Sequence, residues 1–129
     1  AQGVKLARPD RQVVAVVGDG SFMYYPQALW TAARYNLPLV TVICNNRCYL
    51  NDKFPLSELR GPTARIGDYA CVDIANPDVD FVKCAQAIGA HGERVESPGD
   101  LGPALRRALN SGLPSVVDVA IDPWQYEGS

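Results

Sequence analysis

Two patterns of apolar residues alternate along the chain. Short β-branched runs predict strands, and apolar residues at a helical spacing predict helices. The β-branched apolar runs at residues 12–17 and 37–44 are typical of buried parallel strands. Between them, residues 26–35 carry apolar side chains at a helical spacing, after a proline suited to a first helical turn. Residues 12–44 therefore predict a strand, a helix and a second strand, with the length of one right-handed crossover.

A similar alternation occupies the last third of the chain. Residues 80–88 place apolar side chains on one helical face, and residues 93–95 form a short strand candidate. Residues 101–109 predict a further helix, and residues 115–121 form a last β-branched apolar run. We expect residues 1–129 to form one doubly wound α/β domain, with a mainly parallel sheet flanked by helices.

Three segments depart from this alternation. Residues 47–79 are polar and rich in proline and glycine, so they predict a long loop, and loops of that length often serve a site. Residues 1–7 predict a helix that is already under way at a first residue other than Met, which indicates a fragment of a longer chain. Residues 122–129 predict a frayed tail.

Composition limits the class of protein. The chain has 47% hydrophobic and 20% charged residues and a net charge of −2, which is typical of a globular domain with its own core and argues against disorder. Such a charge offers no electrostatic footprint for nucleic acid or anionic membrane. The apolar runs are far shorter than the roughly 20 residues that span a bilayer.

The four cysteines indicate a reducing compartment. They form no CxxC pair and are too irregularly spaced for a disulfide framework, so we expect a cytoplasmic protein. Cys44 and Cys48 could offer two thiolates to zinc, but a zinc site needs four ligands. The only histidine, His91, is distant in sequence and is interpreted as a surface or loop residue.

The candidate chemistry lies where two predicted strands end. Gly18-Asp19-Gly20-Ser21 follows the first strand and Asn45-Asn46 closes the second, and parallel strands end at the same edge of a sheet, where ligands bind. A diphosphate held there needs a hard cation, oxygen ligands and backbone N–H groups. Carboxylate and amide oxygens are such ligands, and the two glycines let the backbone approach the phosphates.

Plainer interpretations stay open for the same residues. A lone Gly-Asp-Gly is a weak motif, because strands often end at such turns. Asp19 could cap a turn, Asn46 could close a strand, and Ser21 could be a helix N-cap without any ligand. A Rossmann dinucleotide site is disfavoured because no GxGxxG follows the first strand.

The motifs resemble those of a known enzyme family. Gly18 to Ser21, with 24 residues between Gly20 and the Asn45-Asn46 pair, resembles the binding motif for thiamine diphosphate (ThDP). Residues 6–46, LARPDRQVVAVVGDGSFMYYPQALWTAARYNLPLVTVICNN, look like the acetolactate synthase, benzoylformate decarboxylase and pyruvate decarboxylase group of that family. The resemblance continues more loosely to the end of the chain.

The resemblance implies a ligand set for Mg²⁺ and the cofactor. Asp19 and Asn46 would be the side-chain ligands of Mg²⁺, and Cys48 would be the third protein ligand through its backbone carbonyl, with its thiol incidental. Residues 50–52 would approach the thiazolium and the substrate. The residues implied to bind the cofactor are Gly18, Asp19, Gly20, Ser21, Asn46, Cys48 and Tyr49.

The resemblance also implies that the chain holds only half of an active site. The glutamate that activates the cofactor would belong to a pyrimidine-binding domain of the same or a second subunit, so no catalytic residue is assigned here and the chain alone should be inactive. The full protein would be a decarboxylase or carboligase acting on a small 2-oxo acid, as a homodimer or homotetramer. Two rivals are a non-catalytic phosphate- or nucleotide-binding module and a structural fragment.

Four aromatic side chains are interpreted as packing residues rather than cofactor contacts. They lie in and around the helix predicted at residues 26–35 and are Tyr24, Tyr25, Trp30 and Tyr35. Apolar surface normally covered by the missing domain is expected to make the isolated chain self-associate.

Overall fold

A four-stranded parallel sheet forms the centre of the structure, a computed structural model that describes residues 1–122. The strands lie in the order β1-β2-β4-β3, and every neighbouring pair is parallel. Their bounds are β1 Val14–Gly18, β2 Val40–Asn45, β3 His91–Val95 and β4 Ser115–Ala120. The predicted α/β class with a parallel sheet is confirmed.

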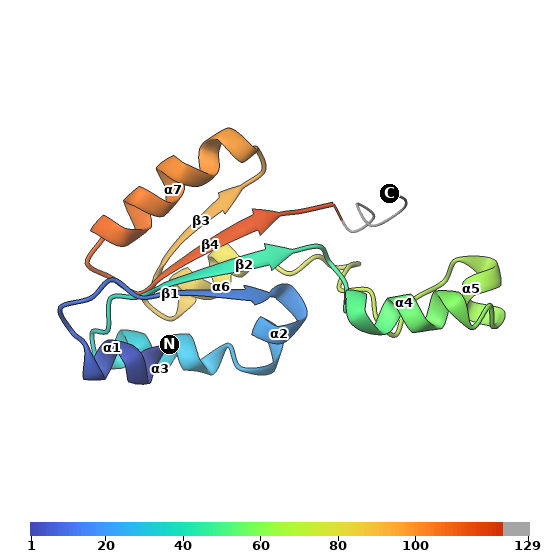
Figure 1. The fold of residues 1–129 in the computed structure, drawn as a ribbon, viewed down its shortest axis with the longest axis horizontal. Helices are drawn as coiled ribbons and strands as arrows, with labels where there is room; N and C mark the ends of the chain where they lie inside the picture. The colour runs from blue at the N-terminus through green and yellow to red at the C-terminus, as the bar shows by residue number, and fades with distance from the viewer. Residues whose placement is uncertain (123–129) are drawn as a thin grey trace.

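Helices cover both faces of this sheet, as the doubly wound prediction requires (Figure 1). One face carries the helices α2, α3 and α6, and α7 packs alone on the other. At the N-terminus, α1 lies beside α3, where the Gln2 side chain donates to the Ala28 carbonyl. The bounds are α1 Gln2–Ala7, α2 Asp19–Tyr24, α3 Gln27–Arg34, α6 Phe81–Ala87 and α7 Pro98–Asn110.

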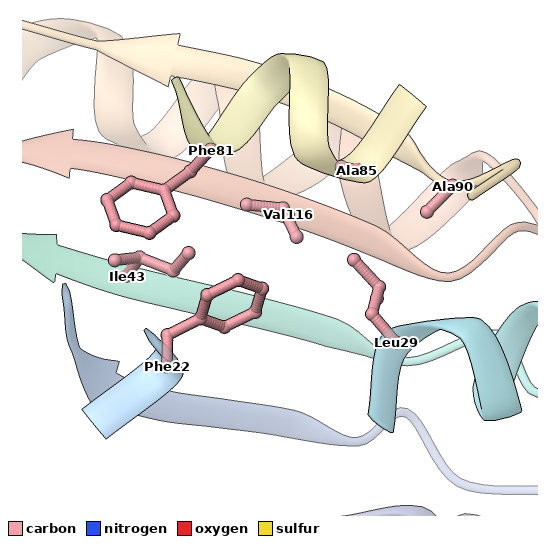
Figure 2. Packing of buried hydrophobic residues seen from close by; sticks show 7 residues of the cluster. All are labelled: Phe22, Leu29, Ile43, Phe81, Ala85, Ala90 and Val116. Atoms are coloured by element: carbon pink, nitrogen blue, oxygen red, sulfur yellow. The ribbon is translucent and has the colours of Figure 1, made fainter. Parts of the chain in front are cut away.

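The core beneath α2, α3 and α6 centres on two phenylalanines (Figure 2). The Phe22 and Phe81 rings meet edge to face with centroids 5.5 Å apart, a favoured aromatic geometry. They pack on Ile43 of β2 and Val116 of β4, both fully buried. Alternate residues of the same strands, such as Val117, face α7 instead.

The segment predicted as one long loop contains two helices, α4 Leu50–Glu58 and α5 Pro62–Ile66, so that prediction is wrong. Prolines and glycines in it suggested breaks in regular structure. In the fold, Pro62 instead occupies the first position of α5 and Gly67 ends it in the left-handed conformation, with φ of 67°. Both helices extend beyond the carboxyl ends of the strands (Figure 1).

Several side chains also lie elsewhere than predicted. The four aromatic residues expected to pack, Tyr24, Tyr25, Trp30 and Tyr35, are each more than half exposed. The helix α3 turns Leu29 and Ala32 inward, so neighbouring positions face outward.

Two strand assignments are corrected as well. The strand β1 is an edge strand rather than a buried one, since its Val16 is 66% exposed. His91 is not a surface or loop residue, because it begins β3 and is half-buried.

Two expectations concern the ends and the membrane. Of the predicted frayed tail at residues 122–129, residues 123–129 lie outside the described part of the chain. Within residues 1–122, no helix combines the length and apolar character needed to cross a bilayer.

Candidate functional site

A cavity of about 300 Å³ opens where β1 and β2 end. Because both strands run in the same direction, Gly18 and Asn46 reach the same edge of the sheet although they are far apart in sequence. The structure therefore brings together all the residues that the resemblance implied to bind the cofactor. The cavity is lined by Gly18, Asp19, Gly20, Ser21, Tyr24, Asn46, Cys48, Tyr49, Leu50, Asn51 and Asp52.

Asp19 is a buried carboxylate with one unused oxygen. Its side chain is only 2% exposed; Oδ1 accepts a hydrogen bond from the Gly20 N–H at 2.8 Å. The second oxygen, Oδ2, is buried and has no hydrogen-bond partner within residues 1–122. An unpaired buried charge is costly, and a cation is the group that would best offset it.

The surroundings of Asp19 act on its protonation in opposite directions. Burial is the largest influence and raises the pKa of the carboxyl above its ordinary value, whereas nearby backbone N–H groups lower it. Those of Arg47 and Cys48 belong to the loop after β2 and act on Asp19 without bonding to it, because their hydrogen bonds go to Asn45 and Asn46. That loop therefore lies beside the Asp19 side chain.

Gly20 leaves room for an aromatic ring. A Cβ atom built on Gly20 would lie 2.5 Å from ring atoms of Tyr49, closer than real side chains approach. The Tyr49 ring also lies near the Tyr24 ring, with centroids 6.0 Å apart. Tyr24, expected to be a packing residue, is thus a wall of the cavity.

Ser21 is not the N-cap of the helix that begins this segment. Gly18 occupies the N-cap position of α2, and Ser21 is the third residue inside the helix. Its side chain is exposed and lines the cavity. The alternative interpretation of Ser21 as a helix N-cap is therefore wrong.

The Asn46 side chain accepts hydrogen bonds from its own loop. Its Oδ1 accepts the N–H of Cys48 at 3.1 Å, as in an Asx turn, and also accepts the Cys48 thiol at 3.5 Å. The thiol is a weak donor, so a cation bound at this oxygen would replace the thiol hydrogen bond. The Cys48 thiol is buried, and burial raises its pKa, which keeps it protonated and unreactive.

A second segment, residues 72–74, is hydrogen-bonded to the loop after β2. The Tyr49 N–H donates to the Val72 carbonyl at 2.8 Å, and the Ile74 N–H donates to the Arg47 carbonyl at 2.6 Å. Between these two bonds, the side chain of Lys53 forms an ion pair with Asp73 at 2.7 Å. Lys53 is 9% exposed and lies over the Tyr69 ring, so its ammonium is shielded from water, whereas the Asp73 side chain is 36% exposed.

Sequence reasoning missed these supporting residues. Lys53 and Asp73 are 20 positions apart in a segment read as a loop, and nothing in their spacing indicated a pair. Asp118, a buried residue of β4, could have been noticed in the sequence, because it is a charged residue within the apolar run of the last predicted strand. A buried Asp there requires polar partners.

The four cysteines are free. Cys44 is half-buried in β2 and Cys48 is buried in the loop that follows. Within residues 1–122, no three or more His, Cys, Asp or Glu side chains gather in a way that could hold a metal ion. A metal in the cavity would therefore depend on amide and backbone oxygens as well as Asp19.

Comparison with known families decides between the interpretations of this edge. Residues 1–119 match the family model described as thiamine pyrophosphate enzyme, C-terminal TPP binding domain, and thiamine pyrophosphate is another name for ThDP. The chain belongs to this family. The resemblance seen in the Gly18 to Ser21 and Asn45-Asn46 motifs is thereby confirmed.

Relatives of this ThDP-binding domain are enzymes of several kinds. The chain is 42% identical over 123 residues to a probable acetolactate synthase from Mycobacterium bovis, covering 95% of this chain and 21% of that protein. It is 36% identical over 120 residues to 2-hydroxyacyl-CoA lyase from Oryza sativa subsp. japonica, covering 92% of this chain and 20% of that protein.

A solved structure shares the fold. The ThDP-dependent 4-hydroxybenzoylformate decarboxylase of Rhodococcus jostii RHA1 superposes with a TM-score of 0.79 at 35% identity, covering 95% of this chain and 22% of that one. The chain thus spans about a fifth of the length of the relatives that it matches.

Proposed function

We propose that this chain holds the Mg²⁺-diphosphate end of ThDP within a longer 2-oxo acid decarboxylase or carboligase. The observation that carries the proposal is the buried Asp19 carboxylate, whose Oδ2 has no partner within residues 1–122. It lies at the rim of a cavity shared with Asn46. A dication there would offset the buried charge.

The donor set at the cavity suits Mg²⁺. Asp19 offers an anionic oxygen, Asn46 a neutral one and Cys48 its backbone carbonyl, and Mg²⁺ prefers hard oxygen ligands. A complete shell has six oxygens, so the diphosphate and water would supply the others. Gly18, Gly20, Ser21 and Tyr49, which line the same cavity, are proposed to contact the diphosphate.

The role of the chain is to hold and orient rather than to react. Bound ThDP supplies an electron sink for carbanion chemistry at a carbonyl carbon. The side chains around this cavity anchor the opposite, diphosphate end of the cofactor. We therefore propose that the activating glutamate comes from a pyrimidine-binding domain of the same or a second subunit, and that the chain alone is inactive.

An exposed aromatic surface supports such a partner. Tyr24 on α2 is 65% exposed, Tyr25 between the two helices is 70% exposed, and Trp30 on α3 is 54% exposed. Aromatic side chains are enriched at protein interfaces. We propose that this surface meets the second domain in a cytoplasmic homodimer or homotetramer.

The non-catalytic rival is not favoured by the comparisons, because the relatives named above are a synthase, a lyase and a decarboxylase. Those names differ in substrate. They support the cofactor class and leave the choice among 2-oxo acids to experiment.

Calorimetry of the full-length protein tests the proposal. ThDP should bind with Mg²⁺ present and much more weakly with EDTA, and ATP with Mg²⁺ should not compete. Assays of CO₂ release from a panel of 2-oxo acids, including pyruvate and benzoylformate, then test the activity. Absence of Mg²⁺-dependent ThDP binding, or displacement of ThDP by ATP, would overturn the proposal.

A further inference from the structure

A row of polar side chains crosses three neighbouring strands beneath the candidate site. Arg94 on β3 lies directly opposite Asp118 on β4, and its guanidinium reaches Asp118 Oδ2 at 2.7 Å. The other oxygen, Asp118 Oδ1, accepts a hydrogen bond at 2.9 Å from Nδ2 of Asn45 on β2. The row ends at the last residue of β2, beside the loop that carries Asn46.

Fold stability alone does not explain this row. Asp118 is 1% exposed and Asn45 is 5% exposed, and most of their neighbours in β4 and β2 are apolar. The Arg94 side chain is 42% exposed, so its pair with Asp118 offsets the cost of burying this carboxylate only in part. Fold stability therefore gives little reason for a carboxylate at this position.

Asp118 decides which end of the Asn45 amide faces the loop. An ionised carboxylate only accepts hydrogen bonds, so the amide must turn its NH₂ group toward Asp118. The amide oxygen then faces the opposite way, where it accepts the Arg47 N–H at 3.2 Å. A residue at position 118 that could also donate would no longer dictate this orientation.

The bond to Arg47 holds a disfavoured backbone conformation. Arg47 has φ of 58°, in the left-handed region that residues other than glycine rarely adopt. This turn lies between Asn46 and Cys48, the two loop residues proposed to ligate Mg²⁺. An acceptor fixed beneath the Arg47 N–H keeps both ligands in place.

We infer that Asp118, acting through Asn45, is a positioning residue for the Mg²⁺-binding loop. The inference rests on the proposed function, because it assumes that Asn46 and Cys48 ligate Mg²⁺. It assigns to a buried residue of the central sheet an effect on the affinity of a cation that the residue does not touch.

The test measures by calorimetry how ThDP binding by the full-length protein depends on the Mg²⁺ concentration. Asp118→Asn keeps the shape of the side chain but lets it donate as well as accept. Loss of a residue that orients a metal ligand typically lowers metal affinity 10- to 100-fold. The Mg²⁺ concentration for half-maximal ThDP binding should therefore rise by about 10- to 100-fold. At saturating Mg²⁺ and ThDP, kcat should stay within a few-fold of the parent value.

Two further variants separate positioning from general damage. Asn45→Ala removes the acceptor for the Arg47 N–H directly and should raise the Mg²⁺ requirement by a similar factor. The double variant should be little worse than either single one, because both act through the same bond. Glu93→Gln is the matched control, since Glu93 lies on β3 of the same sheet and pairs with Arg107 of α7, away from the loop. It should leave the Mg²⁺ requirement unchanged.

The outcomes distinguish the inference from the proposed function. If the parent binds ThDP with Mg²⁺ but Asp118→Asn shifts the Mg²⁺ requirement no more than Glu93→Gln does, the inference is overturned and the function stands. A fall in kcat at saturation with an unshifted Mg²⁺ requirement overturns it as well. If Asp118→Asn does not fold, Asn45→Ala decides the question alone. A parent that binds no ThDP overturns both.

Discussion

Replacing Asp19 with asparagine separates what this carboxylate costs the fold from what it contributes to binding. Asparagine has the same shape, and its Oδ1 can still accept the Gly20 N–H that Asp19 accepts at 2.8 Å. The substitution removes the charge from a side chain that is 2% exposed. It therefore alters electrostatics with little change in packing.

The expected loss of binding is large because the Asp19 side chain is buried. Removing one partner of a buried charge pair costs about 3–5 kcal/mol, since the other charge is left uncompensated. That free energy corresponds to a loss of affinity of about 100-fold to several thousand-fold. Mg²⁺-dependent ThDP binding by Asp19→Asn should weaken by this factor.

Without Mg²⁺ the effect on stability should have the opposite sign. Asp19 Oδ2 has no partner within residues 1–122, and an unpaired buried carboxylate is more costly than an unpaired neutral amide, whose cost is about 1–3 kcal/mol. The metal-free variant should thus unfold at the same temperature as the parent or at a higher one.

Calorimetry and thermal unfolding of the full-length protein, each with Mg²⁺ and with EDTA, measure the two effects together. Asp80→Asn is a suitable control, because Asp80 is an N-cap that accepts the Lys83 N–H. Asparagine caps a helix as well as aspartate does, and the lost ion pair of Asp80 with Lys83 is solvent-exposed and contributes little. This variant should therefore leave ThDP binding unchanged and alter stability only slightly. An Asp19→Asn protein that binds ThDP like the parent, or that is less stable than the parent in EDTA, would refute the reasoning.

Four other substitutions probe the close contacts and the surface charge. Gly20→Ala should push the Tyr49 ring into the cavity, because a Cβ there lies 2.5 Å from ring atoms; a displacement of this kind can lower ThDP affinity by up to about 100-fold in calorimetry. Gly92→Ala should cost about 1–3 kcal/mol in chemical denaturation, since its Cβ would lie 2.9 Å from a backbone oxygen of α6. Gly99→Ala, with no atom within 4 Å, should not destabilise. Glu93→Gln should cost about 0.2–1 kcal/mol at neutral pH. A hydrogen bond from an arginine lowers the Glu93 pKa, so this contribution is complete above the unfolded-state pKa and disappears as the pH falls through the folded-state pKa; denaturation curves of parent and variant should converge in acid.

The sequence predicted the frame of the site because local patterns determine that frame. β-branched runs define the strands, and parallel strands bring their carboxyl ends to one edge. Asp19 and Asn46 therefore meet there as expected. The same spacing explains why Trp30 is exposed, since it lies off the apolar face that Leu29 and Ala32 form on α3. Its aromatic character alone had suggested burial.

The supports of the site could not be predicted in this way. Asn45 and Asp118 are 73 positions apart, and their contact depends on the strand order, which places β4 next to β2. The pairing of Lys53 with Asp73 depends on the path of a segment whose prolines and glycines concealed two helices. Contacts of this kind follow from tertiary structure, and periodicity carries no information about them.

The two halves of the proposed Mg²⁺ site differ in how far the fold satisfies them. In the loop, the Asn46 oxygen, the Arg47 N–H and carbonyl and the Tyr49 N–H all have hydrogen-bond partners. Asp19 Oδ2, across the cavity, has none within residues 1–122. Because the loop is already ordered, binding need not spend free energy on ordering it. The favourable change on binding a cation would come chiefly from pairing the Asp19 charge, and the loop would set the geometry in which that pairing occurs.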